Sequence, residues 1–332
     1  MPDALPPRPD IAAVEAEHPF AQYVRPLGRG PGRSRALTRE EARIALGMVL
    51  RDEADAHQIG AFLMLLRYRG EDPQEMAGLV EAARDHFGPG LPPGCAPIAL
   101  DWPSYGAGRT RGAPWFLLAA LALARAGHRI LMHGSNEFTR GTAVTAALGV
   151  LGLPIATSRN EAVGHLAARN FAYLPLACLC PTLDGLLRLR GLLGLRSPIN
   201  TAARLLNPFD APASVDGVFH PPYIALHVAT AALLDQGRLV VVKGGGGEAE
   251  RNPAKPLTAH VYDRAAGPAE LSFPAWVAEP GSEDLLATWE TGAGPGAATA
   301  RATIALALIA LNLARTPEDA DGQAEAIWAT RR

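Results

Sequence analysis

The chain has 332 residues, 48% of them hydrophobic and 19% charged, which predicts a folded protein with a large core and excludes a disordered one. A formal net charge of −2 argues against the uniformly basic domain that simple polyanion-binding proteins often have. No apolar run reaches the roughly 18–20 residues of a membrane span and no secretory signal pattern opens the chain, so we expect a cytoplasmic protein without membrane contact.

The first 36 residues are rich in proline, glycine and arginine, which predicts an extended arm with a short helix near residues 11–18. Between residues 25 and 35 the arm carries cations and no acid: Arg25, Arg29, Arg33 and Arg35. Arginine forks suit phosphate oxygens, so the arm is a candidate for contacts with a phosphate backbone. The alternative is a solvated tail without a ligand.

A helical domain is predicted for residues 37–90. Thr38 and Glu41 form the capping-box pattern, in which the hydroxyl and the carboxylate each satisfy a free amide at the helix start. A second apolar-periodic segment follows, and a third begins at Asp72, a typical N-cap residue. The Arg- and Leu-rich stretch 181–210 also has a helical pattern, and we expect it to return to this domain.

Strand-like and helix-like segments alternate in residues 91–332, which is typical of an α/β domain with a mostly parallel central sheet covered on both faces. Expected strands lie at 97–102, 128–134, 171–179, 238–244, 259–263 and 270–276. Expected helices lie at 113–127, 142–152, 221–237 and 297–313. We therefore predict an α/β fold class, with a small N-terminal helical domain joined to a larger α/β domain.

Three glycine-containing loops follow predicted strands, at residues 104–112, 132–141 and 243–253. Ligands of open α/β sheets bind at the carboxyl ends of the strands, and glycine lets backbone amides approach a phosphate closely. The loops therefore predict an anion site, in which we assign no catalytic residue. Its candidate residues are Gly106, Gly108, Arg109, Arg111, His133, Gly134, Asn136, Arg140, Lys243, Gly245, Arg251 and Lys255. Tyr105 and Trp115 are candidates for base stacking, with a core position as the alternative for Trp115.

Several residues near these loops have a structural alternative. His133 would then be a turn histidine bonded to the backbone, because isolated histidines are seldom catalytic. Glu248 and Glu250, in the third loop, would join a structural ion network. Their partners would be Arg251 and Arg109. The three cysteines fit no zinc ligand set and are expected to be reduced.

The order of several segments resembles the anthranilate phosphoribosyltransferase family, over residues 37–262. LTREEARIALGMVL and the two helices after it are similar to the family's N-terminal helical domain, which nucleoside phosphorylases share. YGAGR (105–109), MHGSN (132–136), LLGLRSPINTAARLLNP (192–208) and KGGGGEAERNP (243–253) stand where the family has its glycine-rich diphosphate loop, KHGNR, LGxRTxxNxxGPLxNP and HGxxGLDExxP. The resemblance implies the transferase fold and a homodimer formed through the helical domain. It also implies that Arg196 contacts an aromatic acid, and the alternative is an ion pair with Asp184.

This chain departs from the family's pattern at several ligand positions. Arg109 replaces the acid of the diphosphate loop, Met132 replaces the lysine of KHGNR, and Glu137 stands at its arginine position. Ala249 and Glu250 stand where the family has the Asp-Glu pair that holds Mg²⁺. Magnesium wants carboxylate and phosphate oxygens together, so these changes predict weak metal and diphosphate binding. We therefore expect neither transferase activity nor a cofactor, with Glu250 as the one candidate metal ligand.

The rewritten loops and the arm RPLGRG…SRALTREEA resemble a divergent branch of the family, the YbiB-like proteins. That resemblance implies a homodimeric protein that binds nucleic acid, DNA or RNA, on the transferase fold. The cations named above, Arg196 included, would form one backbone-directed, salt-dependent surface with little sequence specificity. Two alternatives stay open. One is a transferase acting on a phosphoribosyl diphosphate-like molecule with Mg²⁺, and the other is a regulatory subunit that binds another protein through the helical domain.

Overall fold

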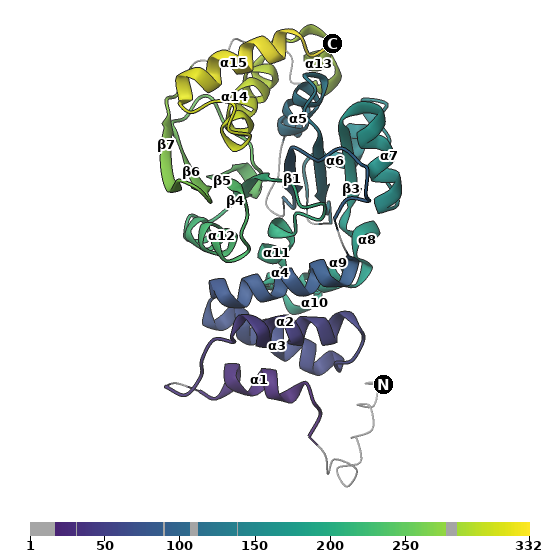
Figure 1. Ribbon diagram of the computed structural model, residues 1–332, viewed down its shortest axis with the longest axis vertical. Helices are drawn as coiled ribbons and strands as arrows, with labels where there is room; N and C mark the ends of the chain where they lie inside the picture. Colours follow the sequence, from purple (N-terminus) through teal and green to yellow (C-terminus); the bar gives the residue numbers. More distant parts are fainter. Residues whose placement is uncertain (1–16, 31, 89, 107–111, 138, 277–283) are drawn as a thin grey trace, which may run out of the picture.

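The computed structural model describes residues 17–30, 32–88, 90–106, 112–137, 139–276 and 284–332. Figure 1 shows an elongated molecule with a helical domain at one end and an α/β domain at the other. The predicted fold class, a small N-terminal helical domain with a larger α/β domain, is confirmed. The short helix expected at residues 11–18 lies largely outside the described residues.

The helices of the N-terminal bundle begin at residues that cap them. α2 (Arg39–Leu50) has the predicted capping box: the Glu41 amide donates to Thr38 Oγ1 at 3.2 Å, and the Thr38 amide donates to the Glu41 carboxylate at 2.8 Å. α3 (Ala56–Arg69) and α4 (Pro73–Phe87) start with the same arrangement. Because these caps satisfy amides that would otherwise lack partners, the three helices keep defined ends and pack as one bundle.

The segment predicted as an extended arm contains a helix instead. α1 (Ala21–Gly28) places Tyr23 and Leu27 in the core, and the ring of Phe20 lies edge-on to Phe62 of α3, 5.4 Å between centroids. Burial of these large side chains outweighs the helix-breaking tendency of the surrounding proline and glycine residues. In Figure 1, α1 lies at the end of the molecule farthest from the sheet. The extended-arm prediction is therefore wrong for the residues of α1.

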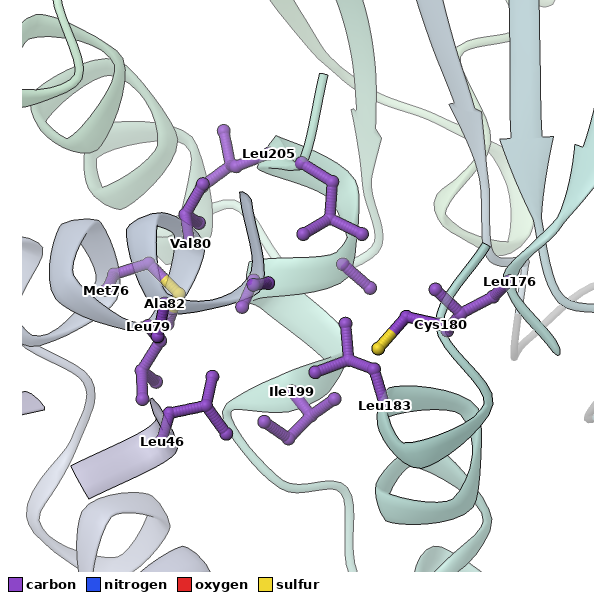
Figure 2. Close-up of a cluster of buried hydrophobic side chains, with 14 of the residues drawn as sticks. Leu46, Met76, Leu79, Val80, Ala82, Leu176, Cys180, Leu183, Ile199 and Leu205 are labelled. Atoms are coloured by element: carbon purple, nitrogen blue, oxygen red, sulfur yellow. The ribbon is translucent and has the colours of Figure 1, made fainter. Parts of the chain in front are cut away.

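Four short helices return from the α/β domain to the helical domain: α8 (Leu176–Leu179), α9 (Pro181–Arg188), α10 (Arg190–Leu193) and α11 (Ile199–Ala202). A single 3-10 turn, Ala203–Leu205, follows them. Figure 2 shows Leu183 and Ile199 of this segment directed toward Leu46 of α2 and Leu79 of α4. Their apolar contacts hold residues 176–205 against the bundle, although these residues follow the first strands of the α/β domain in the chain.

Seven strands form one sheet in the order β3-β2-β1-β4-β5-β6-β7. The parallel strands are β1 (Leu100–Ser104), β2 (Ile130–Gly134), β3 (Phe171–Pro175), β4 (Ala213–Val218) and β5 (Arg238–Lys243). β6 (Leu257–Asp263) and β7 (Gly267–Phe273) extend the sheet in antiparallel orientation. Val218, the last residue of β4, lines a cleft together with Arg67 of α3. The carboxyl edge of the parallel strands therefore faces the helical domain.

Helices cover both faces of the sheet. α5 (Trp115–Arg125), α14 (Pro295–Ala310) and α15 (Pro317–Ala329) pack on one face. α7 (Arg159–Arg169) packs on the other face against β3, and α12 (Pro222–Leu233) packs on it against β5. The remaining helices are α6 (Val144–Val150) and α13 (Leu285–Thr291), visible in Figure 1. Among the described residues no single helix has the length and apolar content of a membrane span; α13 and α14 reach that level only together, across a bend of 73°.

One arginine, Arg159, contacts two segments in which the chain passes between the domains, and we call this set of contacts the Arg159 clasp. The Arg159 guanidinium of α7 donates to the carbonyls of Gly90 at 2.9 Å and Pro208 at 3.3 Å, and also to the carbonyl of Phe87. It lies between the rings of Phe87 and Phe209, 5.6 and 5.0 Å from their centroids. This Arg159 clasp ties the end of α4 and the segment before β4 to the same helix of the α/β domain.

Candidate anion-binding cleft

The three strand-end loops come together at the carboxyl edge of the sheet. The Thr139 hydroxyl of the second loop donates to the Gly106 carbonyl of the first at 3.0 Å. Glu248 of the third loop packs so closely against Gly106 that a β-carbon added there would lie 2.2 Å from the carboxylate. Gly108, Arg109 and Arg111, predicted for the same site, lie outside the described residues.

Carboxylates of the third loop occupy this edge at positions where an anion would bind. The buried Glu248 accepts a hydrogen bond from the Ser104 hydroxyl at 3.2 Å. Glu250 accepts one from the Phe116 amide at 3.0 Å, in the first turn of α5. A helix start favours an anion, and here a carboxylate of the chain itself takes that position. Glu250 therefore caps a helix rather than standing ready for a metal, and the described residues contain no group of three metal-binding side chains.

Arg251 belongs to the core and not to an anion site. Its side chain is fully buried between β7 and α15, where it forms an ion pair with Asp321 at 2.5 Å. The guanidinium also donates to the Pro274 carbonyl at 3.0 Å and lies 4.3 Å from the centroid of the Phe273 ring. Both predictions for Arg251, phosphate contact and pairing with the loop glutamates, are wrong because the guanidinium is fully buried and pairs with Asp321 of α15.

His133 is fully buried inside β2. Its Nδ1 lies 2.8 Å from the Tyr105 hydroxyl, and its Nε2 lies 3.3 Å from the Asp101 carboxylate. The phosphate-ligand prediction and the turn-histidine alternative are therefore both wrong. Tyr105 is only 3% exposed, so it cannot stack on a base. The ring of Trp115 packs against Gly296 of α14, which confirms the core alternative for Trp115.

Two other predicted ligands have structural positions. A β-carbon added to Gly134 would lie 1.9 Å from the Ser104 carbonyl oxygen, so this glycine permits the close approach of β1 and β2. Asn136 holds the start of α6, where its Oδ1 accepts a hydrogen bond from the Val144 amide at 3.2 Å. The predicted loop residues that are exposed are Arg140, Lys243, Gly245 and Lys255.

The arginines of the predicted arm do not reach the sheet edge. Arg25 in α1 forms an ion pair with Glu17. Arg35 donates two hydrogen bonds, of 2.6 and 2.7 Å, to the Glu41 carboxylate, and these lower the pKa of Glu41 to about 2. The remaining two, Arg29 and Arg33, are exposed next to α1, at the end of the molecule opposite the sheet (Figure 1). The prediction of one cationic surface formed by arm and loops is therefore wrong.

A cleft between the two domains gathers arginines from distant parts of the chain. We call it the arginine cleft. Its helical side carries Arg67, Arg196 and Arg204, and its α/β side carries Phe219, His220 and His227. Arg67 comes from α3, whereas the other two arginines come from the segment that returns to the helical domain. The cleft thus brings together positive charge and an aromatic side chain beside the strand ends.

Arg196 has no carboxylate partner among the described residues. The carboxylate of Asp184, its expected partner, instead accepts a hydrogen bond from Arg188 at 2.7 Å, so the ion-pair alternative for Arg196 is wrong. Burial lowers the pKa of Arg196, and the neighbouring Arg190 and Arg204 guanidinium groups lower it further. Positive charge in the cleft is therefore only partly compensated, and a bound anion would relieve the repulsion.

The other two arginines of the cleft are held in place by neighbours. Arg204, 9% exposed, donates to the carbonyl of Gly217 at 3.2 Å and to further carbonyls. Arg67 pairs with Glu71 at 3.4 Å and donates to the Tyr223 hydroxyl. Burial raises the pKa of the Glu71 carboxyl, which weakens its capacity to neutralise the cleft.

Sequence reasoning identified Arg196 but missed the other two arginines of the cleft. Arg204 stands in the segment 192–208 that resembles a family motif, so this segment was the available signal. Arg67 lies in the last turn of α3, where a cation is usual because the helix dipole favours positive charge there, and nothing in the local sequence distinguishes it. Only the tertiary fold, in which α3 and the returning segment line the same cleft, brings the arginines together.

The known proteins similar to this chain include an uncharacterized protein and anthranilate phosphoribosyltransferases. A model of the glycosyl transferase family helical bundle domain matches residues 21–87, which include α1. The uncharacterized protein YbiB of Escherichia coli (strain K12) is 28% identical over 247 residues, 74% of this chain and 77% of YbiB. The anthranilate phosphoribosyltransferase of Nitratidesulfovibrio vulgaris is 31% identical over 231 residues, 68% of this chain and 65% of that enzyme. The match thus spans just under two thirds of the enzyme's length.

Solved structures share the whole architecture. The anthranilate phosphoribosyltransferase from Thermus thermophilus has a TM-score of 0.74 at 20% identity, covering 95% of both chains. The enzyme from Saccharomyces cerevisiae, in complex with PRPP and Mg, has a TM-score of 0.73 at 17% identity over 95% of both chains. At such identities the likeness concerns the fold. Taken with the helical bundle domain and the sequence relatives, it shows that this chain belongs to the anthranilate phosphoribosyltransferase-like proteins of the glycosyltransferase family 3 type.

Proposed function

We propose that this chain binds nucleic acid through the arginine cleft, with little sequence specificity. The observation that carries the proposal is the half-buried Arg196, which lies beside other arginines and has no carboxylate partner among the described residues. Guanidinium forks match phosphate oxygens in geometry and charge. Contacts of this kind follow the backbone of a nucleic acid and carry no sequence information.

An exposed aromatic ring supports nucleic acid rather than a bare anion as the ligand. Phe219 is 44% exposed on one wall of the cleft, and the Arg196 guanidinium lies 5.9 Å from its ring centroid. Nucleobases stack on such rings whatever their identity, at about 1–3 kcal/mol per base. A phosphate contact next to a stacking surface matches one nucleotide of a single strand.

We expect Arg196→Ala to weaken binding of a single-stranded oligonucleotide about tenfold, or about 1.4 kcal/mol, because a charge-assisted contact is lost. Fluorescence anisotropy at two salt concentrations measures this effect, and the affinity should fall as salt rises. Arg315→Ala is the matched control, since it removes the same charge from an exposed position between α14 and α15. Absence of binding at low salt, or equal losses for the two variants, would contradict the proposal.

The alternative function is a transferase acting on a phosphoribosyl diphosphate-like molecule with Mg²⁺. The activity of the related anthranilate phosphoribosyltransferases favours it. The local chemistry of this chain does not, because Glu250 caps α5 and the buried Met132 stands in place of the family's lysine. Calorimetric titration with phosphoribosyl diphosphate and Mg²⁺ distinguishes the two functions. Micromolar binding would support the transferase.

We also propose that the helical domain forms a homodimer contact. Two large apolar side chains of its bundle are exposed, Tyr68 on α3 at 90% and Leu192 on α10 at 82%. A contact between two copies would remove this surface from water. We expect light scattering to give a dimer for the wild type and a monomer for the double variant Tyr68→Glu, Leu192→Glu. Val150→Glu, at a 55% exposed position of the α/β domain, is the control. A monomeric wild type would refute the contact.

A further inference from the structure

The charge of the arginine cleft is suited to a dianion. Three arginines and one glutamate, Glu71, line it, so cations outnumber acids among its lining side chains, and Arg196 has no carboxylate partner among the described residues. An internal phosphodiester carries a single negative charge, whereas a terminal phosphate carries about −1.5 to −2 near neutral pH. Charge complementarity therefore favours a phosphate at the end of a strand over one within it.

Buried polar groups that line the cleft support the same conclusion. Ser197, Asn200 and Thr201 line the cleft and are each at most 7% exposed. Next to them, three backbone carbonyls hold the Arg204 guanidinium in place. A terminal phosphate offers three free oxygens to the surrounding donors, whereas an internal phosphodiester offers two.

The cleft wall that carries Phe219 can hold the base next to the bound phosphate. Phe219 belongs to the β4–α12 loop, and its ring faces the Arg196 guanidinium across the cleft. A terminal phosphate at Arg196 places the first nucleobase of the strand near this ring. A terminal nucleotide thereby contacts both the arginines and the aromatic ring of the cleft.

We infer that the arginine cleft receives the phosphorylated end of a nucleic-acid strand, in preference to an internal phosphodiester. The inference rests on the proposed function and adds the ligand class to it. A free nucleoside monophosphate has the same phosphate chemistry, but it lacks the further backbone contacts that a strand makes with the exposed cations outside the cleft.

The test is competition against an internally labelled single strand of about 12 nucleotides, followed by fluorescence anisotropy. The unlabelled competitors carry a 5′-phosphate, a 3′-phosphate or hydroxyl groups at both ends, and a fourth competitor is the nucleoside monophosphate. We expect one of the end-phosphorylated strands to compete at least about fivefold better than the hydroxyl-ended strand. Arg196→Gln should abolish this preference, Arg196→Lys should keep part of it, and Arg315→Gln should keep all of it.

The outcomes distinguish a failure of the end preference from a failure of the proposed nucleic-acid binding. Equal competition by phosphorylated and hydroxyl-ended strands would overturn the end preference while leaving nucleic-acid binding intact. A nucleoside monophosphate that competes as well as the strand would overturn it in favour of a free nucleotide. If the labelled strand does not bind at low salt, the proposed function itself fails. Circular dichroism of each variant shows that a lost preference reflects the missing guanidinium and not unfolding.

Discussion

An Arg251→Ala variant is expected to unfold with a free energy about 3 kcal/mol lower than the wild type. The change removes the partner of Asp321 and leaves a void beside the Phe273 ring, in a region where the arginine side chain is fully buried. Urea unfolding followed by circular dichroism measures this loss. Nucleic-acid affinity of the folded variant should stay at the wild-type level, because the side chain lies between β7 and α15.

Arg264→Ala is the control for this experiment. Arg264 also forms an ion pair, with Asp235 at 2.9 Å, but the two side chains are 58% and 76% exposed. Surface pairs of this kind contribute about 0–1 kcal/mol, so little change is expected. Arg251 would be reassigned to the candidate anion site under either of two results. One is a loss of unfolding free energy as small as that of the control, and the other is weaker nucleic-acid binding without loss of stability.

Gly134→Ala should destabilise the protein by about 3 kcal/mol or more. The new methyl group would lie 1.9 Å from the Ser104 carbonyl oxygen on the neighbouring strand, and backbone cannot give way as a flexible side chain can. β1 and β2 would have to separate at their carboxyl ends, in the middle of the sheet. Thermal and urea unfolding both report the change.

Gly149→Ala provides the comparison within the same domain. Gly149 lies in α6 with no neighbour close enough to touch a new methyl group, so the better helix propensity of alanine should stabilise the protein by about 0.5–1 kcal/mol. A neutral Gly134→Ala would mean that this glycine serves as a loop residue for a ligand and not as a point of strand contact.

Elements with a local signal could be predicted from the sequence. The capping residues Thr38 and Asp72 stand where α2 and α4 begin, and the β-branched run before Lys243 forms β5. β4 was missed because Asp216 and Gly217 are unfavourable strand residues. Asp216 is tolerated there because it lies 2.8 Å from Nδ1 of a histidine in α12, a contact that no local pattern reveals.

The sequence predicts which loops form the candidate site but not where their side chains point. That the loops after β1, β2 and β5 meet follows from the geometry of a parallel sheet. The direction of a side chain at a strand end depends on tertiary packing, and for this reason His133 and Arg251 were assigned to a ligand when both are buried. Arg67 was missed for the same reason, since α3 and the returning segment are far apart in sequence.

The Arg159 clasp has a consequence for the distance between the two walls of the arginine cleft. The walls of the arginine cleft belong to different domains, with Arg196 on one and Phe219 on the other. Arg159 donates to the Phe87 and Pro208 carbonyls, which belong to segments that connect the domains, so its hydrogen bonds restrain rotation of one wall relative to the other. Arg159 does not line the cleft, so a residue outside the site contributes to the spacing of its two walls.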